Sequence, residues 1–160
     1  RLFHKNIVSD DFVNYKKPSM FVSTCFCSWK CCLENRMDIS VCQNSPLANM
    51  PVVDVSNDEM IEIYDKSIFH SSVVFGGLEP FEQFAELYSF IWDFREKHND
   101  DIVIYTGFNK EEISPCIDRL KEFSNIIIKF GRYIPNSEKH FDGVLGVTLA
   151  SLNQYAEKIS

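Results

Sequence analysis

Short apolar runs alternate with amphipathic stretches along the whole chain. The apolar runs cover residues 20–24, 52–55, 73–75, 102–105, 125–129 and 143–149. Several are rich in β-branched residues and bounded by turn residues, which predicts β-strands. Because nearly every position in them is apolar, we expect the strands to be covered on both faces, as in a parallel sheet.

Between these runs, apolar residues recur at three- and four-residue steps, the spacing of one helix face. This predicts helices over residues 57–67, 80–98, 110–123 and 152–159. Alternating strands and helices predict right-handed crossovers and an α/β fold. A full (β/α)8 barrel needs roughly 200 residues or more. In a chain of 160 residues, about six mostly parallel strands would therefore form a partial, open (β/α) barrel.

Composition narrows the class of protein further. No low-complexity segment, internal repeat or Pro/Gly/Ser-rich linker is found, so residues 1–160 are expected to form a single domain. The formal charge is -7 and the basic residues are scattered, which speaks against nucleic acid as a partner. No apolar stretch approaches the roughly 20 residues of a membrane span, and the first residues lack the apolar centre of a secretory signal. We therefore expect a cytoplasmic protein that does not bind membranes.

Five of the six cysteines gather in one segment directly after the first apolar run. They are Cys25, Cys27, Cys31, Cys32 and Cys42, whereas Cys116 stands alone in a helical pattern. A disulfide framework does not space its bridges in this way, and clustered thiols in a cytoplasmic chain indicate a metal. Because the segment follows a strand, its thiols would lie at the carboxyl edge of the sheet, where α/β proteins bind ligands.

Two kinds of metal site compete for these thiols. Three residues separate Cys27 from Cys31, and ten separate Cys31 from Cys42. Structural zinc sites usually use close pairs of ligands, and Cys42 has no near partner. The spacing therefore favours an iron–sulfur cluster, for which thiolates are the usual ligands, and leaves two alternatives, a structural zinc site and thiols that bind no metal. Cys25 and Cys32 are rival ligands beside the first two.

Four stretches resemble the radical S-adenosylmethionine (SAM) superfamily, in particular the small activating enzymes of anaerobic (class III) ribonucleotide reductase. They read FVSTC…CSWKC…CQN, VVFGGLEP at 73–80, DIVIYTGF at 101–108 and LGVTLASLNQ at 145–154. They are similar, in order, to the family's FVSGC start with its CxxxC pair, its Gly-Gly-Glu-Pro motif, its Tyr-Thr-Gly-Tyr strand end and its terminal Gly-Ser-Ser-Asn-Gln. The chain departs from the family pattern at two places. The family's third cysteine falls at position 34, which is Glu34 here, and Cys42 is the best match for that cysteine. In a gapless alignment, Leu78 stands where the family has its second Gly.

The resemblance implies a radical SAM oxidoreductase. Cys27, Cys31 and Cys42 would hold a [4Fe–4S] cluster, which would cleave SAM reductively to methionine and a 5′-deoxyadenosyl radical. That radical would install a glycyl radical on a partner such as anaerobic ribonucleotide reductase, with flavodoxin or ferredoxin as electron donor. The alternatives are a radical SAM enzyme that modifies a peptide or small molecule, and a non-catalytic zinc or iron–sulfur binding module.

The same resemblance implies a set of SAM-binding residues: Gly76, Gly77, Glu79, Thr106 and Asn153. A carboxylate beyond a strand end can bond the SAM ammonium, and adjacent glycines let a ligand approach the backbone. Each residue also has a structural interpretation. Glu79 followed by Pro80 would begin a helix, Thr106 would end a strand, and Asn153 would stand beside a Ser151 cap on the last helix.

Overall fold

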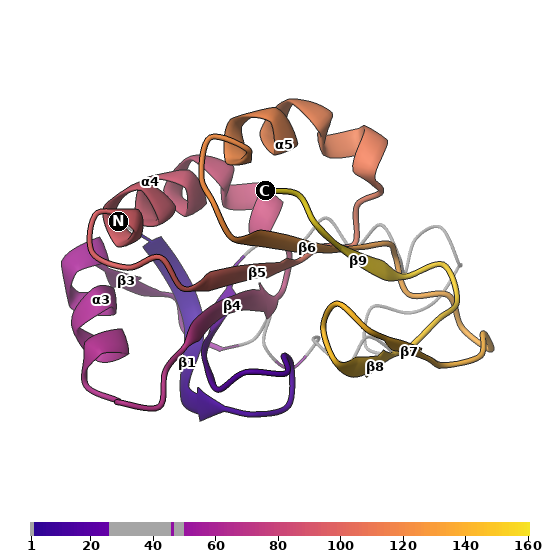
Figure 1. Cartoon of the computed structure of the whole chain (residues 1–160), viewed down its shortest axis with the longest axis horizontal. Helices are drawn as coiled ribbons and strands as arrows, with labels where there is room; N and C mark the ends of the chain where they lie inside the picture. The colour runs from indigo at the N-terminus through magenta and orange to yellow at the C-terminus, as the bar shows by residue number, and fades with distance from the viewer. Residues whose placement is uncertain (1, 26–45, 47–49) are drawn as a thin grey trace.

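The computed structural model describes residues 2–25, 46 and 50–160. A seven-stranded sheet in the order β3–β1–β2–β4–β5–β6–β9 runs through the molecule (Figure 1). Its strands are β1 (Leu2–Asp11), β2 (Ser19–Thr24), β3 (Val53–Val55), β4 (Ser72–Gly77), β5 (Asp101–Tyr105), β6 (Ile126–Phe130) and β9 (Tyr155–Lys158). A separate hairpin pairs β7 (His140–Asp142) with β8 (Val147–Leu149).

The centre of the sheet is parallel and consists of β2, β4, β5 and β6. These strands follow one another in the chain and in the sheet, so right-handed crossovers place their helices on one face. The helices α3 (Asn57–Asp65), α4 (Phe84–Arg95) and α5 (Ser114–Leu120) lie together on that side (Figure 1). The predicted α/β class with a mostly parallel central sheet is thereby confirmed.

The flanks of the sheet are antiparallel. β1 runs antiparallel to both β2 and β3, and β9 runs antiparallel to β6. In the part of the chain that the structure describes, no pairing joins the edge strands β3 and β9, so the sheet is not a closed barrel. No helix among these residues is long and apolar enough to cross a bilayer.

Alternation along the parallel strands divides the core in two. Val73 and Phe75 of β4 face the helices and pack with the aromatic side chains of α4, while Val74 between them faces the other way. The second, smaller cluster is closed by residues of the β1–β2 loop and of the β7–β8 hairpin: Tyr15, Leu145 and Leu149. Both faces of the central strands are therefore apolar, which explains why these runs contain almost no polar positions.

The first three predicted helices are confirmed with shorter bounds. Ser56 caps α3, and Glu59 completes a capping box with it. Each of the next two begins with a separate 3₁₀ turn, η2 (Pro80–Gln83) before α4 and η3 (Lys110–Ile113) before α5.

The helix predicted over residues 152–159 is wrong. Residues 151–153 form a turn, and Tyr155–Lys158 is the strand β9, which pairs antiparallel with β6. Ala156 of β9 is buried in the smaller core cluster while its neighbours are more exposed. The backbone hydrogen bonds available along the edge of β6 override a weak helical spacing over so few residues.

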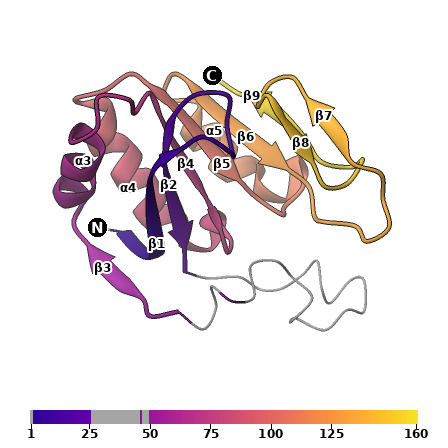
Figure 2. The same ribbon diagram turned by 90° about the horizontal axis from the view of Figure 1, so that it is seen from below.

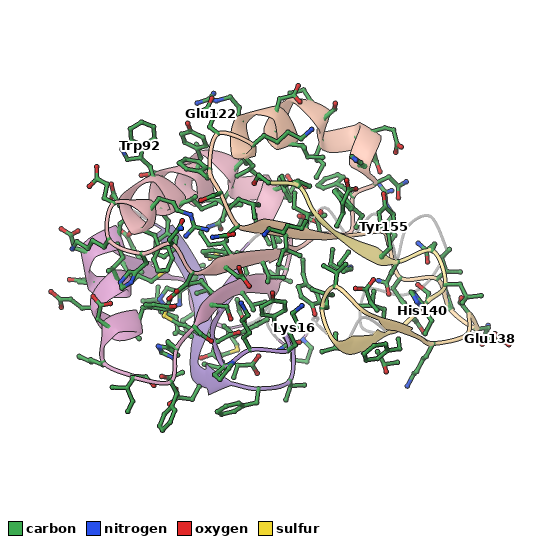
Figure 3. The ribbon with its side chains drawn as sticks, viewed as in Figure 1. Lys16, Trp92, Glu122, Glu138, His140 and Tyr155 are labelled. Carbon is green, nitrogen blue, oxygen red and sulfur yellow. The ribbon has the colours of Figure 1, made fainter. Side chains whose placement is uncertain are left out.

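The strand predicted over residues 143–149 is a turn and the second strand of a hairpin. Asp142 accepts hydrogen bonds from the backbone N–H groups of Val144 and Leu145, and Gly146 has a φ of 73°, so the chain reverses here. The hairpin lies beside β9 in both views (Figures 1 and 2). Figure 3 labels His140 of the hairpin and Tyr155 of β9. His140 Nε2 lies 2.7 Å from the carbonyl oxygen of Gln154, the residue before β9.

Asp101 connects the β1–β2 loop to the start of β5 through two hydrogen bonds. Its Oδ2 accepts hydrogen bonds from the Tyr15 hydroxyl (2.7 Å) and from Lys17 Nζ (2.8 Å). Burial alone would raise the pKa of Asp101, but the two hydrogen bonds and the Lys17 charge outweigh it and hold the pKa below its ordinary value. A carboxyl of this kind stabilises the fold above its unfolded-state pKa, and this stability is lost as the pH falls through the lowered folded-state pKa.

Asp101→Asn is therefore expected to lower the free energy of unfolding at neutral pH by about 1.5–3 kcal/mol, the usual range for hydrogen bonds to a charged group. The difference from the parent should shrink below about pH 4, where the unfolded aspartate takes up a proton. Urea unfolding at both pH values measures the effect, with the exposed Asp118→Asn of α5 as the matched control. An equal loss at both pH values would show that the charge of Asp101 does not contribute.

Candidate functional site

The carboxyl ends of the four parallel strands meet at one edge of the sheet. Thr24 at the end of β2 lies in register with Gly77 of β4, and its hydroxyl donates to the carbonyl oxygen of Gly76 (3.1 Å). β5 ends beside them at Tyr105, which is followed directly by Thr106. Ligands of α/β proteins bind at this edge. The fold therefore brings the start of the cysteine segment close to the Gly-Gly-Leu-Glu turn and Thr106.

Gly76 and Gly77 end β4 where neighbouring residues come close. Gly77 has a φ of 78°, a left-handed conformation that favours glycine. A Cβ atom on Gly77 would lie 2.9 Å from the Cβ of Ser23, and one on Gly76 would lie 2.9 Å from the ring of Phe21. Packing in the sheet thus already requires glycine at position 77, whereas a side chain at position 76 would displace the Phe21 ring. The predicted contact of both glycines with SAM would use the same close approach.

Glu79 is a buried carboxylate that joins two loops of this edge. Its Oε1 accepts hydrogen bonds from the Thr106 hydroxyl and from the Gly107 backbone N–H, both at 2.8 Å. Its Oε2 accepts one from the backbone N–H of Phe81 (3.0 Å), which caps the start of η2. The structural interpretation of Glu79 is therefore confirmed: it begins a helical turn, and it also connects that turn to the end of β5.

The hydrogen bonds around Glu79 leave one acceptor position of its carboxylate for a positively charged ligand. Burial raises its pKa, and the three hydrogen bonds and the positive charge of Lys129 offset part of that rise. A carboxylate has about four acceptor positions. The described donors, all neutral, fill two on Oε1 and one on Oε2, so Oε2 keeps one position. A positively charged donor would stabilise such a buried carboxylate most.

Asn153 is connected to this edge through the loop that follows β6. Its side-chain amide donates to the carbonyl oxygen of Arg132 (2.7 Å) and accepts from the Ser151 hydroxyl (2.6 Å). Gln154 Nε2 likewise donates to the carbonyl oxygen of Gly131 (3.2 Å). The terminal Asn-Gln pair therefore shapes the β6 loop instead of capping a helix, which corrects the structural interpretation of Asn153.

Two basic residues lie at the end of β6 and differ in their surroundings. Arg132 forms a bidentate ion pair with Glu112 at 2.6 and 2.7 Å. Lys129 is buried, and its Nζ donates to the carbonyl oxygen of Gly131 (3.2 Å) and lies 5.6 Å from the centre of the Tyr105 ring. Lys129 is thus the basic group whose charge acts on Glu79.

The cysteines are described only in part. Cys27, Cys31 and Cys42, and the rival Cys32, lie outside the described residues. Cys25 is buried, its backbone N–H donates to Gln83 Oε1 (3.3 Å), and burial raises the pKa of its thiol. Within the described ranges, no three His, Cys, Asp or Glu side chains converge as a metal site.

Comparison with protein families decides the class of the chain. The model of the 4Fe–4S single cluster domain family matches residues 16–146, well over half of the chain. The chain belongs to this family. The 4Fe–4S single cluster domain is of the radical SAM type, and the match supports a [4Fe–4S] cluster over structural zinc. Comparison with curated proteins and with solved structures gave no match.

The carboxyl edge of this 4Fe–4S domain suits such a cluster. Soft thiolate donors are the ligands that iron–sulfur clusters use, and the cysteine-rich segment leaves β2 directly beside Gly77. Two contacts that the sequence did not predict fix the start of the cysteine-rich segment. Thr24, a member of the FVSTC motif, bonds to Gly76, and Gln83 bonds to the backbone of Cys25. A polar Gln83 between Phe81 and Phe84 in an otherwise apolar helix face was the available signal.

Proposed function

We propose that this chain is a radical SAM oxidoreductase that cleaves SAM reductively at the carboxyl edge of its central sheet. The observation that carries the proposal is the buried Glu79, with one acceptor position left, beside the strand end from which the cysteine segment departs. Cys27, Cys31 and Cys42 would hold the [4Fe–4S] cluster and leave one iron for SAM. When bound and reduced, the cluster supplies the electron that breaks the C5′–S bond of SAM, which yields methionine and a 5′-deoxyadenosyl radical.

The residues of the chain would bind and orient SAM. Glu79 Oε2 would accept a hydrogen bond from the SAM ammonium, a charge-assisted contact in a buried setting. Gly76 and Gly77, which carry no side chain, would let SAM approach the backbone at the end of β4. Thr106 and Asn153 complete the proposed set, Thr106 at the end of β5 and Asn153 through the β6 loop that it holds.

We infer further that the radical acts on a glycine of a partner protein, as in the activation of anaerobic ribonucleotide reductase. Among the described residues no pairing joins the edge strands of the sheet, and a radical in an open site needs cover from solvent that a large substrate would provide. The 5′-deoxyadenosyl radical would take a hydrogen atom from the glycine Cα, giving 5′-deoxyadenosine and a glycyl radical. Flavodoxin or ferredoxin would supply the single electron.

Electron paramagnetic resonance tests the partner. The reconstituted, reduced protein is mixed with SAM and with anaerobic ribonucleotide reductase from the same source, and we expect a glycyl radical signal on the reductase. A reductase whose radical-bearing glycine is changed to alanine is the control and should give no signal. SAM consumption without a glycyl radical would contradict the activase and would favour an enzyme that modifies a peptide or a small molecule.

A further inference from the structure

The hydroxyl of Thr106 is held in one direction by its neighbours. Thr106 is 2% exposed, and its backbone N–H donates to the carbonyl oxygen of Lys129 (2.9 Å), which fixes it to the end of β6. Its Oγ1 accepts a hydrogen bond from the backbone N–H of Phe108 (3.0 Å). Because threonine is branched at Cβ, its rotamer is restricted as well. The hydroxyl proton is therefore directed at Glu79 Oε1, 2.8 Å away.

Because the Thr106 hydroxyl donates to Oε1, Oε2 is the oxygen of Glu79 that keeps an acceptor position. The Thr106 hydroxyl and the Gly107 N–H together fill the acceptor positions of Oε1, whereas Oε2 receives only the Phe81 N–H from the described residues. Rotation about the last side-chain bond of a glutamate is otherwise broad. Without the hydroxyl, Oε1 would keep only the Gly107 N–H, and the carboxylate would be held less firmly in the orientation that presents Oε2 to a ligand.

We propose that Thr106 is a positioning residue, which orients Glu79 so that Oε2 meets the SAM ammonium. The proposal rests on the proposed function and changes one part of it, because Thr106 then acts on SAM through Glu79 and not by direct contact. Thr106 also stabilises the negative charge of Glu79, because its hydroxyl donates to the ionised carboxylate and so opposes the rise in pKa that burial causes.

A double-mutant cycle with a conservative rescue tests this role. SAM affinity is measured by calorimetry under anaerobic conditions on the reconstituted parent, Thr106→Val, Glu79→Gln and the double variant. We expect Thr106→Val to weaken SAM binding roughly three- to tenfold and to add less than about twofold in the Glu79→Gln background, because the two residues act as one unit. Thr106→Ser, which keeps the hydroxyl, should bind SAM within about twofold of the parent.

Iron content and melting temperature are recorded for every variant, and Thr148→Val on the exposed side of β8 is the matched control. Thr106→Ala carries the same comparison where valine disturbs the fold. An equal effect of Thr106→Val in both backgrounds would mean direct contact with SAM and would overturn the proposal, as would unchanged affinity in Thr106→Val. Failure of the parent to bind SAM would instead overturn the proposed function, and this inference with it.

Discussion

Replacing Cys27, Cys31 or Cys42 with alanine is expected to abolish the iron–sulfur cluster. Three thiolates are the usual protein share of a cluster whose fourth iron binds SAM, so the loss of one leaves too few ligands. The parent should hold about four irons per chain after anaerobic reconstitution with iron and sulfide, and the variants close to none. Iron and acid-labile sulfide analysis, together with visible absorption, measures this loss.

The remaining cysteines supply the controls for this experiment. Cys116 lies in α5 and packs against the core on the helix face, so alanine at this position should leave the iron content unchanged. Loss of the cluster in Cys25→Ala would show that Cys25 replaces one of the three proposed ligands. A full cluster in Cys42→Ala would show that the third ligand is another thiol, with Cys32 the strongest rival. Stoichiometric zinc in the parent, without iron uptake, would contradict the cluster itself.

Glu79→Gln is expected to weaken SAM binding by about tenfold or more while the iron content stays normal. A carboxylate paired with the SAM ammonium in a buried site contributes about 1.5–3 kcal/mol, and glutamine keeps the shape without the charge. Its amide nitrogen must also face a donor now bound by a carboxylate oxygen, either Phe81 N–H or the Thr106–Gly107 pair. The melting temperature should therefore fall as well. Equilibrium binding and thermal unfolding separate the two effects.

A purely structural Glu79 predicts a different outcome for the same variant. If its carboxylate only caps η2 and joins the two loops, the melting temperature should fall while the affinity for SAM stays at the parent value. Glu82→Gln in the same 3₁₀ turn is the matched control, because Glu82 is exposed. Unchanged affinity in Glu79→Gln would remove Glu79 from the SAM site and leave the Gly-Gly-Leu-Glu turn without its proposed role.

The parallel centre of the fold was predictable because burial on both faces leaves a plain signal. The central positions of β4, β5 and β6 are apolar, and their helices carry clear apolar faces. β1 was not predicted, since its apolar residues come in two pairs separated by polar residues, without the alternation typical of a half-buried strand, and it ends in Ser9, Asp10 and Asp11. β9 was mistaken for a helix, because only its pairing with β6 decides the conformation of so short a segment.

The candidate site was predictable as far as the fold places it. Motifs that end successive parallel strands meet at one edge, so Gly76, Gly77, Glu79 and Thr106 were expected to lie together, and they do. The bond between Glu79 and Thr106 was not foreseen, since it depends on how two loops pack in three dimensions. The contact between Asn153 and Arg132 was not foreseen either. It depends on the turn before β9, and the sequence pattern did not reveal β9.

Formation of 5′-deoxyadenosine tests the central claim most directly. The parent is reconstituted anaerobically with iron and sulfide, reduced in the presence of SAM, and its products are separated by chromatography. The proposed function predicts 5′-deoxyadenosine and methionine in equal amounts from the parent and neither product from Cys27→Ala. A parent that carries its full cluster and leaves SAM intact under these conditions would contradict the assignment of this chain as a radical SAM enzyme.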